Sequence, residues 1–258
     1  MEVGLNSHIV REVSGKGFSI DELGIGLVEL NFDDIPVLNK NGINREILKN
    51  LLGLGVDFTV HAPTSDAKGV RVDLGRYSRS NIITMKNVLK VANELNAKIL
   101  VLHGGEIRKS YHDAYINTMK QIKEVSLVAR DYDIRLAIEN LTGSQVGVLP
   151  HEITSFREYG VLACVDLGHA LLTAFKLGYP LEKFLLPGEN VLEVHIHDNH
   201  GGSDEHLPPG EGSMGWGYVE KLVKNTKPKY AVLEIRRFSS FDSVKNSIKR
   251  LQRIGDER

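Results

Sequence analysis

Cysteine is nearly absent from this sequence, because the 258 residues contain only Cys164. No intramolecular disulfide can form, which fits a reducing compartment, and a lone thiol in the apolar run VLACVDL is typical of a buried structural residue. No apolar run approaches the roughly 20 residues needed to span a bilayer. The first residues also lack the basic and apolar segments of a signal peptide. These absences predict a cytoplasmic protein without a membrane partner.

The chain has no excess of charge of either sign, because it contains 32 basic and 33 acidic residues and its formal net charge is -1. A protein that relies on bulk attraction to nucleic acid or anionic lipid is usually more basic, although a local basic patch remains compatible with a neutral chain. No GxxxxGK[ST] loop, HExxH helix or CxxC pair occurs. The hydrophobic share of 41% is ample for a sizeable core.

Short β-rich runs alternate with longer amphipathic segments along the whole chain. Several runs, such as KILVLHG and YAVLEI, are continuously apolar, as in parallel strands that are covered on both faces. The eight predicted strands are Val3–Asn6, Gly26–Phe32, Val56–His61, Lys98–His103, Ile134–Asn140, Leu162–Asp166, Val191–Asp198 and Tyr230–Arg236. The clearest predicted helices are Asn44–Leu54, Ser78–Asn96, Tyr111–Tyr132, Trp216–Asn225 and Ser240–Ile254. The segments after the first and sixth strands have weaker helical patterns.

Eight strand–helix units favour a closed (β/α)8 TIM barrel over an open doubly wound sheet. No linker rich in glycine, serine or proline divides the chain, so we expect one α/β domain over residues 1–258.

Polar residues of metal-binding types stand at the carboxyl ends of six successive predicted strands. They are His61, His103, Glu139, Asp166, His195 and Glu234. In a barrel these strand ends converge on one mouth. Each residue alone has an ordinary explanation, such as a hydrogen-bonded structural histidine or a helix cap. Together, three imidazoles and three carboxylates directed at one mouth favour a metal site.

Two further pairs strengthen this interpretation. His169 follows Asp166 by three residues in DLGHA, so both side chains can reach one cavity. Asp204 and His206 lie in the polar loop SDEHLPPGEGSMGW, and an Asp-x-His pair in an extended stretch places both side chains on one side. Mixed nitrogen and oxygen donors suit Zn²⁺, Mn²⁺, Fe²⁺ or Co²⁺, with zinc and manganese foremost.

The remaining candidates carry weaker signals. His8 and Glu29 could line the mouth or be structural, His112 and His151 are expected at the surface, and His200 is expected to be structural or in solvent. Because His197 alternates with His195, it is expected to face away and is not taken as a ligand. The run Gly210–Gly217 offers backbone amides where barrels often bind phosphate, but Trp216 is expected to open a helix and pack on the barrel.

The motifs HAP, VLHGG, IEN, VDLGHA, HIHDN, DEHLPPGEG and LE, in this order, resemble the xylose isomerase-like barrel superfamily. It contains sugar and sugar-phosphate isomerases and epimerases, and also AP endonucleases of the endonuclease IV type. The resemblance runs from His61 to Glu234. In the isomerase branch it implies one divalent metal ion held by Glu139, Asp166, His195 and Glu234. In the nuclease branch it implies three zinc ions held by those four residues together with His61, His103, His169, Asp204 and His206.

Two departures separate this chain from the nuclease branch. The chain has ENLTGSQVG where that branch has ENTAGQG, and DLGHA where it has DTCHA. We therefore favour an isomerase or epimerase that stabilises an enediolate with its metal ion, with Glu139 and Glu234 as acid and base. His169 would position a hydroxyl, and Arg236 a phosphate. The expected partner is a small sugar or sugar phosphate, and assembly into a homo-oligomer stays open.

Two alternatives remain. As an AP endonuclease, the chain would bind abasic DNA, with the basic loops Arg71–Arg79 and Arg108–Lys109 on the DNA backbone. As a catalytically silent barrel, it would bind metal or sugar for a regulatory or structural purpose.

Overall fold

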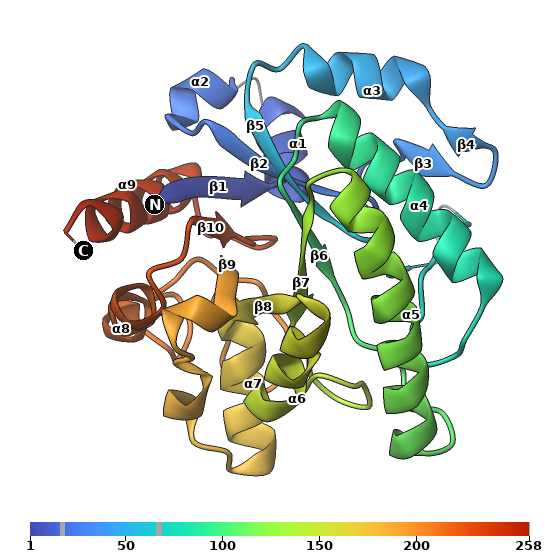
Figure 1. Ribbon diagram of the computed structural model, residues 1–258. Coiled ribbons are helices and arrows are strands. Elements are labelled where there is room, and N and C mark those ends of the chain that lie inside the picture. The colour runs from blue at the N-terminus through green and yellow to red at the C-terminus, as the bar shows by residue number, and fades with distance from the viewer. Residues whose placement is uncertain (16–18, 66–68, 258) are drawn as a thin grey trace. The chain divides into compact units, whose positions relative to one another are not determined.

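The computed structural model describes residues 1–15, 19–65 and 69–257, and its strands and helices alternate along the chain (Figure 1). Eight parallel strands form a closed barrel in the order β1-β10-β9-β8-β7-β6-β5-β2. These strands are β1 (Glu2–Asn6), β2 (Leu27–Asn31), β5 (Asp57–His61), β6 (Ile99–Leu102), β7 (Arg135–Glu139), β8 (Leu162–Asp166), β9 (Val191–Ile196) and β10 (Tyr230–Leu233). The predicted (β/α)8 barrel is thereby confirmed.

The helices follow the strands as expected for this class of fold. They are α1 (Ser7–Gly15), α2 (Ile20–Leu23), α3 (Arg45–Leu52), α4 (Arg79–Glu94), α5 (Tyr111–Asp131), α6 (Pro150–Ser155), α7 (Leu167–Leu177), α8 (Trp216–Thr226) and α9 (Phe241–Asp256). Short 3₁₀ turns cover Phe156–Tyr159, Leu181–Phe184 and Gly188–Asn190. None of the helices within the described ranges is long and apolar enough to cross a bilayer.

The chain forms two compact units, of which one comprises Glu29–Leu162. In this unit β5, β6 and β7 pair in parallel, with Val60 opposite Leu100 and Leu100 opposite Leu136. Helices α4 and α5 lie side by side (Figure 1), and α5 packs on β7. The strand register brings the ends of β5 and β7 to the same edge of this sheet.

The other unit comprises Met1–Val28 and Ala163–Arg258. Here β1, β10, β9 and β8 form a parallel sheet, in which Val232 lies opposite His195 and His195 opposite Asp166. Helix α7 begins directly after β8 because the Asp166 carboxylate accepts a hydrogen bond from the His169 amide, at 2.6 Å.

The observed elements agree with the expected strands and add detail where the pattern was weak. Both weakly patterned segments are helical, as α1 and α7. The first seven residues of helix α7 are all buried, so this part has no solvent-exposed face to give an amphipathic pattern. A small antiparallel hairpin, β3 (Leu38–Asn39) with β4 (Gly42–Ile43), was not predicted.

Candidate metal centre

Three predicted ligands meet in the unit of residues 29–162. His61 ends β5, His103 follows β6, and Glu139 ends β7. His61 Nε2 and His103 Nε2 lie 3.1 and 3.0 Å from the same oxygen, Oε2 of Glu139. His61 Nδ1 donates to the Ala62 carbonyl at 2.9 Å, so a neutral His61 ring presents a lone pair to the carboxylate. A cation between them would relieve that repulsion, so these donors fit a metal ion.

The glycine pair of VLHGG explains how the loops come close beside this cluster. A Cβ on Gly104 would lie 2.0 Å from the Val146 carbonyl oxygen, and one on Gly105 would lie 1.8 Å from the Gly75 amide nitrogen. The Gly105 carbonyl in turn accepts from the Val146 amide at 2.9 Å. Any side chain at either position would separate these backbones.

We therefore expect Gly105→Ala to lower the free energy of unfolding by about 1–3 kcal/mol, because the added methyl overpacks fixed backbone. Urea denaturation would measure the change. Gly202→Ala is the matched control, since nothing lies within 4 Å of a Cβ at that position. Equal stabilities of the two variants would contradict the packing argument.

Three more predicted ligands meet in the other unit. Asp166 ends β8, His195 lies within β9, and Glu234 follows β10. His195 Nδ1 is 3.6 Å from Glu234 Oε2 and 3.9 Å from Asp166 Oδ2. Asp166 and His195 are fully buried and Glu234 is 5% exposed. Buried charges need a partner or an ion, and one imidazole facing two carboxylates is a suitable donor set for a divalent cation.

Glu193 extends this second cluster, and Asp166 has a further role beside it. His195 Nε2 lies 3.4 Å from Oε1 of Glu193, a fully buried residue two positions earlier on β9. Asp166 holds the first turn of α7 as its N-cap while its other oxygen faces His195. Asp166 therefore caps helix α7, which was the ordinary explanation for a strand-end carboxylate, and it also belongs to the cluster.

The loop pair Asp204 and His206 adjoins Asp166 and His169. His206 Nε2 lies 3.0 Å and His169 Nε2 3.3 Å from Oδ2 of Asp204. Burial raises the Asp204 pKa, but the hydrogen bonds from His169 and His206 outweigh it and hold this pKa well below its usual range. Burial lowers the His206 pKa, yet the Asp204 hydrogen bond and nearby carboxylates leave it above its usual value.

The geometry of this pair differs from the one expected. His206 has a φ of 52°, so the segment is not extended as the Asp-x-His spacing predicted. The imidazole still reaches Asp204, because its Nδ1 donates to the Glu234 carbonyl at 2.8 Å and fixes the ring. The side chains of Asp204 and His206 therefore meet because of the turn at His206 and this hydrogen bond, and not because of strand alternation.

The expectation that His197 faces away from the cluster was wrong. Its Nε2 lies 3.1 Å from Asp166, and the residue is fully buried. The physical reason is the two-residue period of extended backbone, which places residues 195 and 197 on one side. The same period could have identified His197 from the sequence.

The glycine-rich run after β9 is held in place by Asp198. Asp198 accepts hydrogen bonds from the amides of Asn199, Gly210 and Met214 at 2.8, 2.9 and 3.1 Å. These contacts already occupy two amides of Gly210–Gly217, the run that offered backbone amides for a phosphate. Asp198 therefore fixes this loop. The sequence did not indicate this role, because Asp198 has the same strand-end position as the carboxylates expected to bind metal.

We expect Asp198→Ala to destabilise the protein by about 2–4 kcal/mol, because three amide donors lose their acceptor. Asp198→Asn should lose less, since one oxygen remains able to accept. Chemical denaturation of both variants would measure this order, and a harmless Asp198→Ala would contradict the assigned role.

The remaining candidate residues mostly lie at the surface or in structural positions. His112 and His151 are exposed and Cys164 is buried, as expected. His200 is largely exposed, with Nδ1 3.0 Å from Glu205. Glu29 is fully buried within β2, and His8 is half-buried in α1. Trp216 opens α8 as predicted, with the Arg250 guanidinium 4.7 Å from its ring centre.

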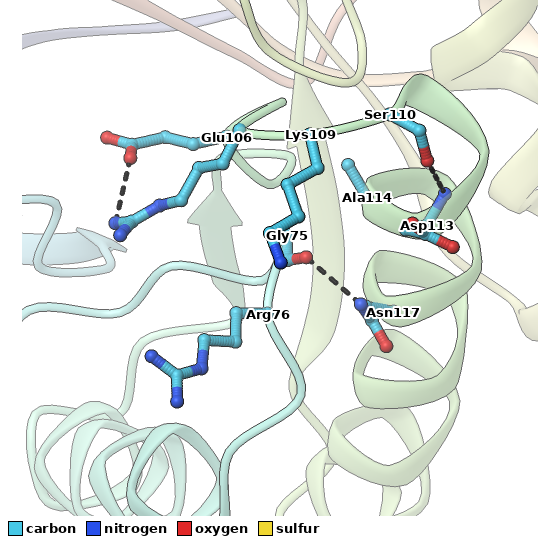
Figure 2. A pocket seen from close by; sticks show the side chains of 9 residues that line it. Gly75, Arg76, Glu106, Lys109, Ser110, Asp113, Ala114 and Asn117 are labelled. Carbon is cyan, nitrogen blue, oxygen red and sulfur yellow. Dashed lines mark hydrogen bonds and ion pairs between the residues drawn. The ribbon is translucent and has the colours of Figure 1, made fainter.

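The basic loops considered for DNA line a cavity of about 540 Å³ at the start of α5 (Figure 2). Its wall mixes charges, since Arg76, Arg108 and Lys109 share it with Glu106 and Asp113. Arg108 is held 3.1 Å from Asp73 and 3.0 Å from Glu106, and Arg71 pairs with Glu106. These carboxylates offset much of the positive charge that a DNA backbone would need.

Comparison with known proteins identifies the family. Residues 19–254 match the xylose isomerase-like TIM barrel family, so this chain belongs to it. An uncharacterized protein of Methanocaldococcus jannaschii, MJ1311, is 28% identical over 239 residues, which are 85% of this chain and 80% of the relative.

Solved structures share the fold. A D-tagatose 3-epimerase-like protein aligns with a TM-score of 0.78 and 23% identity, covering 100% of this chain and 99% of that one. Endonuclease IV from Thermus thermophilus aligns with a TM-score of 0.67 and 18% identity, covering 100% of both chains. At these identities the two structures show that the barrel fold is shared.

Proposed function

We propose that this protein is a divalent-metal-dependent isomerase or epimerase of a sugar or sugar phosphate. The observation that carries the proposal is the fully buried His195, whose Nδ1 faces the carboxylates of Asp166 and Glu234. We propose these three residues as ligands of one ion, with Glu139 at the end of β7 as the fourth. Glu139 is proposed from the order of the strands in the barrel.

The donor set decides the kind of ion. One imidazole with carboxylates suits Zn²⁺ or Mn²⁺ better than an ion that prefers oxygen alone. When bound, such an ion supplies Lewis acidity that polarises a carbonyl and offsets negative charge developing on its oxygen.

The protein's own groups would move the proton. Isomerisation or epimerisation requires removal of a proton from carbon next to a carbonyl, and a positioned carboxylate can take it. We assign this removal and return to Glu234 and Glu139. His169, buried at the start of α7, would hold a substrate hydroxyl, and the exposed Arg236 would meet a phosphate on phosphorylated substrates.

Mixed charge around the basic loops favours a small substrate over DNA. The arginines Arg71 and Arg108 already pair with carboxylates, and the formal net charge is -1. A duplex would have to compete with those ion pairs for each phosphate contact. A small sugar needs no such surface.

One observation keeps the AP endonuclease as a second candidate. Beyond the proposed ligands, His61 with His103 and Asp204 with His206 offer further donors of the kind that a cluster of zinc ions needs. Three closely spaced zinc ions, together with efficient incision of an abasic duplex, would favour this function. A silent metal-binding barrel would instead bind an ion while sugar and DNA assays both stay blank.

The proposed function is tested by solvent-deuterium exchange. Metal-loaded protein is incubated in D₂O with unphosphorylated and phosphorylated ketoses, and NMR follows the C–H signals beside each carbonyl. We expect exchange in at least one ketose and its loss after chelation of the metal. Metal-dependent incision of an abasic duplex, without exchange in any ketose, would overturn the proposal.

A further inference from the structure

Asn6 is the last residue of β1 and is fully buried, yet the proposed reaction gives it no part. Its Oδ1 accepts a hydrogen bond from the Ile9 amide at 3.2 Å and so caps the first turn of α1. This contact also fixes the two ends of the side-chain amide, because a backbone N–H must face the oxygen. Within the described residues, Nδ2 at the other end has no hydrogen-bond partner. A buried donor of this kind is costly unless something supplies an acceptor.

The strand register places Asn6 on the same face of the sheet as Glu234. Val232 lies opposite His195 and also opposite Gly4, so these three residues project to one side. Two positions further along their strands come Asn6 and Glu234, and the two-residue period of extended backbone keeps them on that side. The Glu234 amide still bonds to β9 at 3.1 Å, so the ladder continues through it. Because neighbouring strands are about 4.8 Å apart, the Asn6 amide stands beside the proposed base.

The neighbours of Asn6 on this face do not supply the missing acceptor. Leu27 fills the space that a side chain at Gly4 would occupy, because a Cβ there would lie 2.9 Å from Leu27 Cγ and Cδ2. The Glu234 carboxylate faces His195, whose Nδ1 is 3.6 Å from Oε2, and it accepts no hydrogen bond from Asn6. The acceptor must therefore come from a molecule that enters beyond the carboxyl ends of these strands.

We propose that Asn6 Nδ2 donates a hydrogen bond to the carbonyl oxygen of the substrate, beside the carbon that Glu234 would deprotonate. The inference rests on the proposed function, because it takes Glu234 as a base. In that step the proton passes from carbon to the Glu234 carboxylate. The C–H electron pair becomes the new carbon–carbon π bond, and the carbonyl π pair moves onto oxygen. A fixed N–H donor is most effective where such charge develops.

The cap on α1 holds this donor in place. If the amide turned to bring Nδ2 to another acceptor, Oδ1 would lose the Ile9 amide. Aspartate and serine cap helices about as well as asparagine, but only asparagine adds an NH₂ group. A role limited to the cap would therefore not require the group that is left without a partner. This difference provides the test.

The first experiment removes the donor and keeps the cap. Asn6→Asp has nearly the same shape, but its carboxylate cannot donate, and Asn6→Ser is too short to reach the same oxygen. Solvent-deuterium exchange is measured with D-fructose and D-fructose 6-phosphate, at saturating metal. We expect kcat to fall by about 10²–10³-fold in both variants, with a much smaller change in KM. One variant adds a charge and the other adds space, so their agreement isolates the donor.

Asn44 provides the matched control, because its Oδ1 caps α3 by accepting from the amides of Glu46 and Ile47. Asn44→Asp and Asn44→Ser should exchange at the wild-type rate. Metal content is measured for every variant, so that a lost ion is not mistaken for a lost donor. If Asn6 only caps α1, its two variants will keep the wild-type kcat, and the proposal is overturned. A loss confined to KM would assign Asn6 to a hydroxyl and overturn the contact with the carbonyl oxygen.

A second measurement follows the donor itself, without catalysis. The side-chain NH₂ signals of Asn6 in ¹⁵N-labelled protein are identified by their absence from Asn6→Ser. Addition of the same two ketoses to the zinc-loaded protein should move one of these proton signals downfield, and the signals of the Asn44 side chain should stay in place. Asn6 signals that do not move while a ketose saturates the protein would overturn the proposal.

The role of Asn6 and the proposed function fail in different ways. A wild type that exchanges ketose protons, with Asn6→Asp and Asn6→Ser exchanging equally fast, overturns the role of Asn6 alone. A wild type that neither binds nor exchanges either ketose overturns the role of Asn6 and counts against the isomerase.

Discussion

Glu234→Gln should lower the rate of solvent-deuterium exchange into a substrate ketose by about 10²–10⁴-fold, and Glu139→Gln should do the same. Glutamine keeps the shape of the side chain but cannot take up a proton. Glu234 is 5% exposed and Glu139 is 1% exposed, so water has little access to replace either carboxylate. The measurement is NMR of the exchanging carbon at saturating metal.

Loss of metal must be separated from loss of the base. Metal content is therefore measured for each variant, and rates are compared only where an ion is bound. Glu189→Gln, at an exposed position, is the control and should exchange at the wild-type rate. Exchange that survives in both Glu139→Gln and Glu234→Gln would refute the assigned acid and base.

The second large effect is expected from Asp166→Ala, which should weaken metal binding by at least about 100-fold. Mutation of a residue that only hydrogen-bonds to a metal ligand typically lowers metal affinity about 10–100-fold. Asp166 is proposed as a ligand itself, and it faces His195 and His197 directly. Zinc added at about 100 times its dissociation constant should stabilise the wild type by about 2.7 kcal/mol. The variant should show almost none of this gain in thermal unfolding.

Asp166 also caps α7, so its removal has a second, smaller effect. The lost cap should cost about 1 kcal/mol without metal. Asn44→Ala removes the corresponding cap of α3, which accepts from the amides of Glu46 and Ile47, and serves as the control. Asn44→Ala should lose stability but keep the full gain from zinc. Full zinc stabilisation of Asp166→Ala would remove Asp166 from the ligand set.

The barrel could be predicted because its strands are short apolar runs that parallel pairing buries on both faces. Runs such as the one that ends at His103 are typical of parallel strands that are covered on both faces. The strand-end positions of Glu139 and Asp166 followed from the same pattern. The β3–β4 hairpin did not, because two strands of two residues are too short for any periodic signal.

The loops were harder to predict because their contacts connect segments far apart in sequence. Asp198 binds the amide of Met214, 16 residues away, and no local pattern indicates this. Gly168 likewise lies against the His197 ring, where an added Cβ would be 1.9 Å from Cε1, and no local pattern indicates this contact. His197 itself was accessible to sequence reasoning, and a correct use of the two-residue period would have placed it with His195.

The most direct test of this account is anomalous diffraction at the metal edge from crystals of the purified protein. We expect a strong peak bounded by Asp166, His195 and Glu234, the buried groups that face one another at 3.6 to 3.9 Å. A protein that carries its native ion elsewhere, with these three side chains contacting no metal, would contradict the central claim.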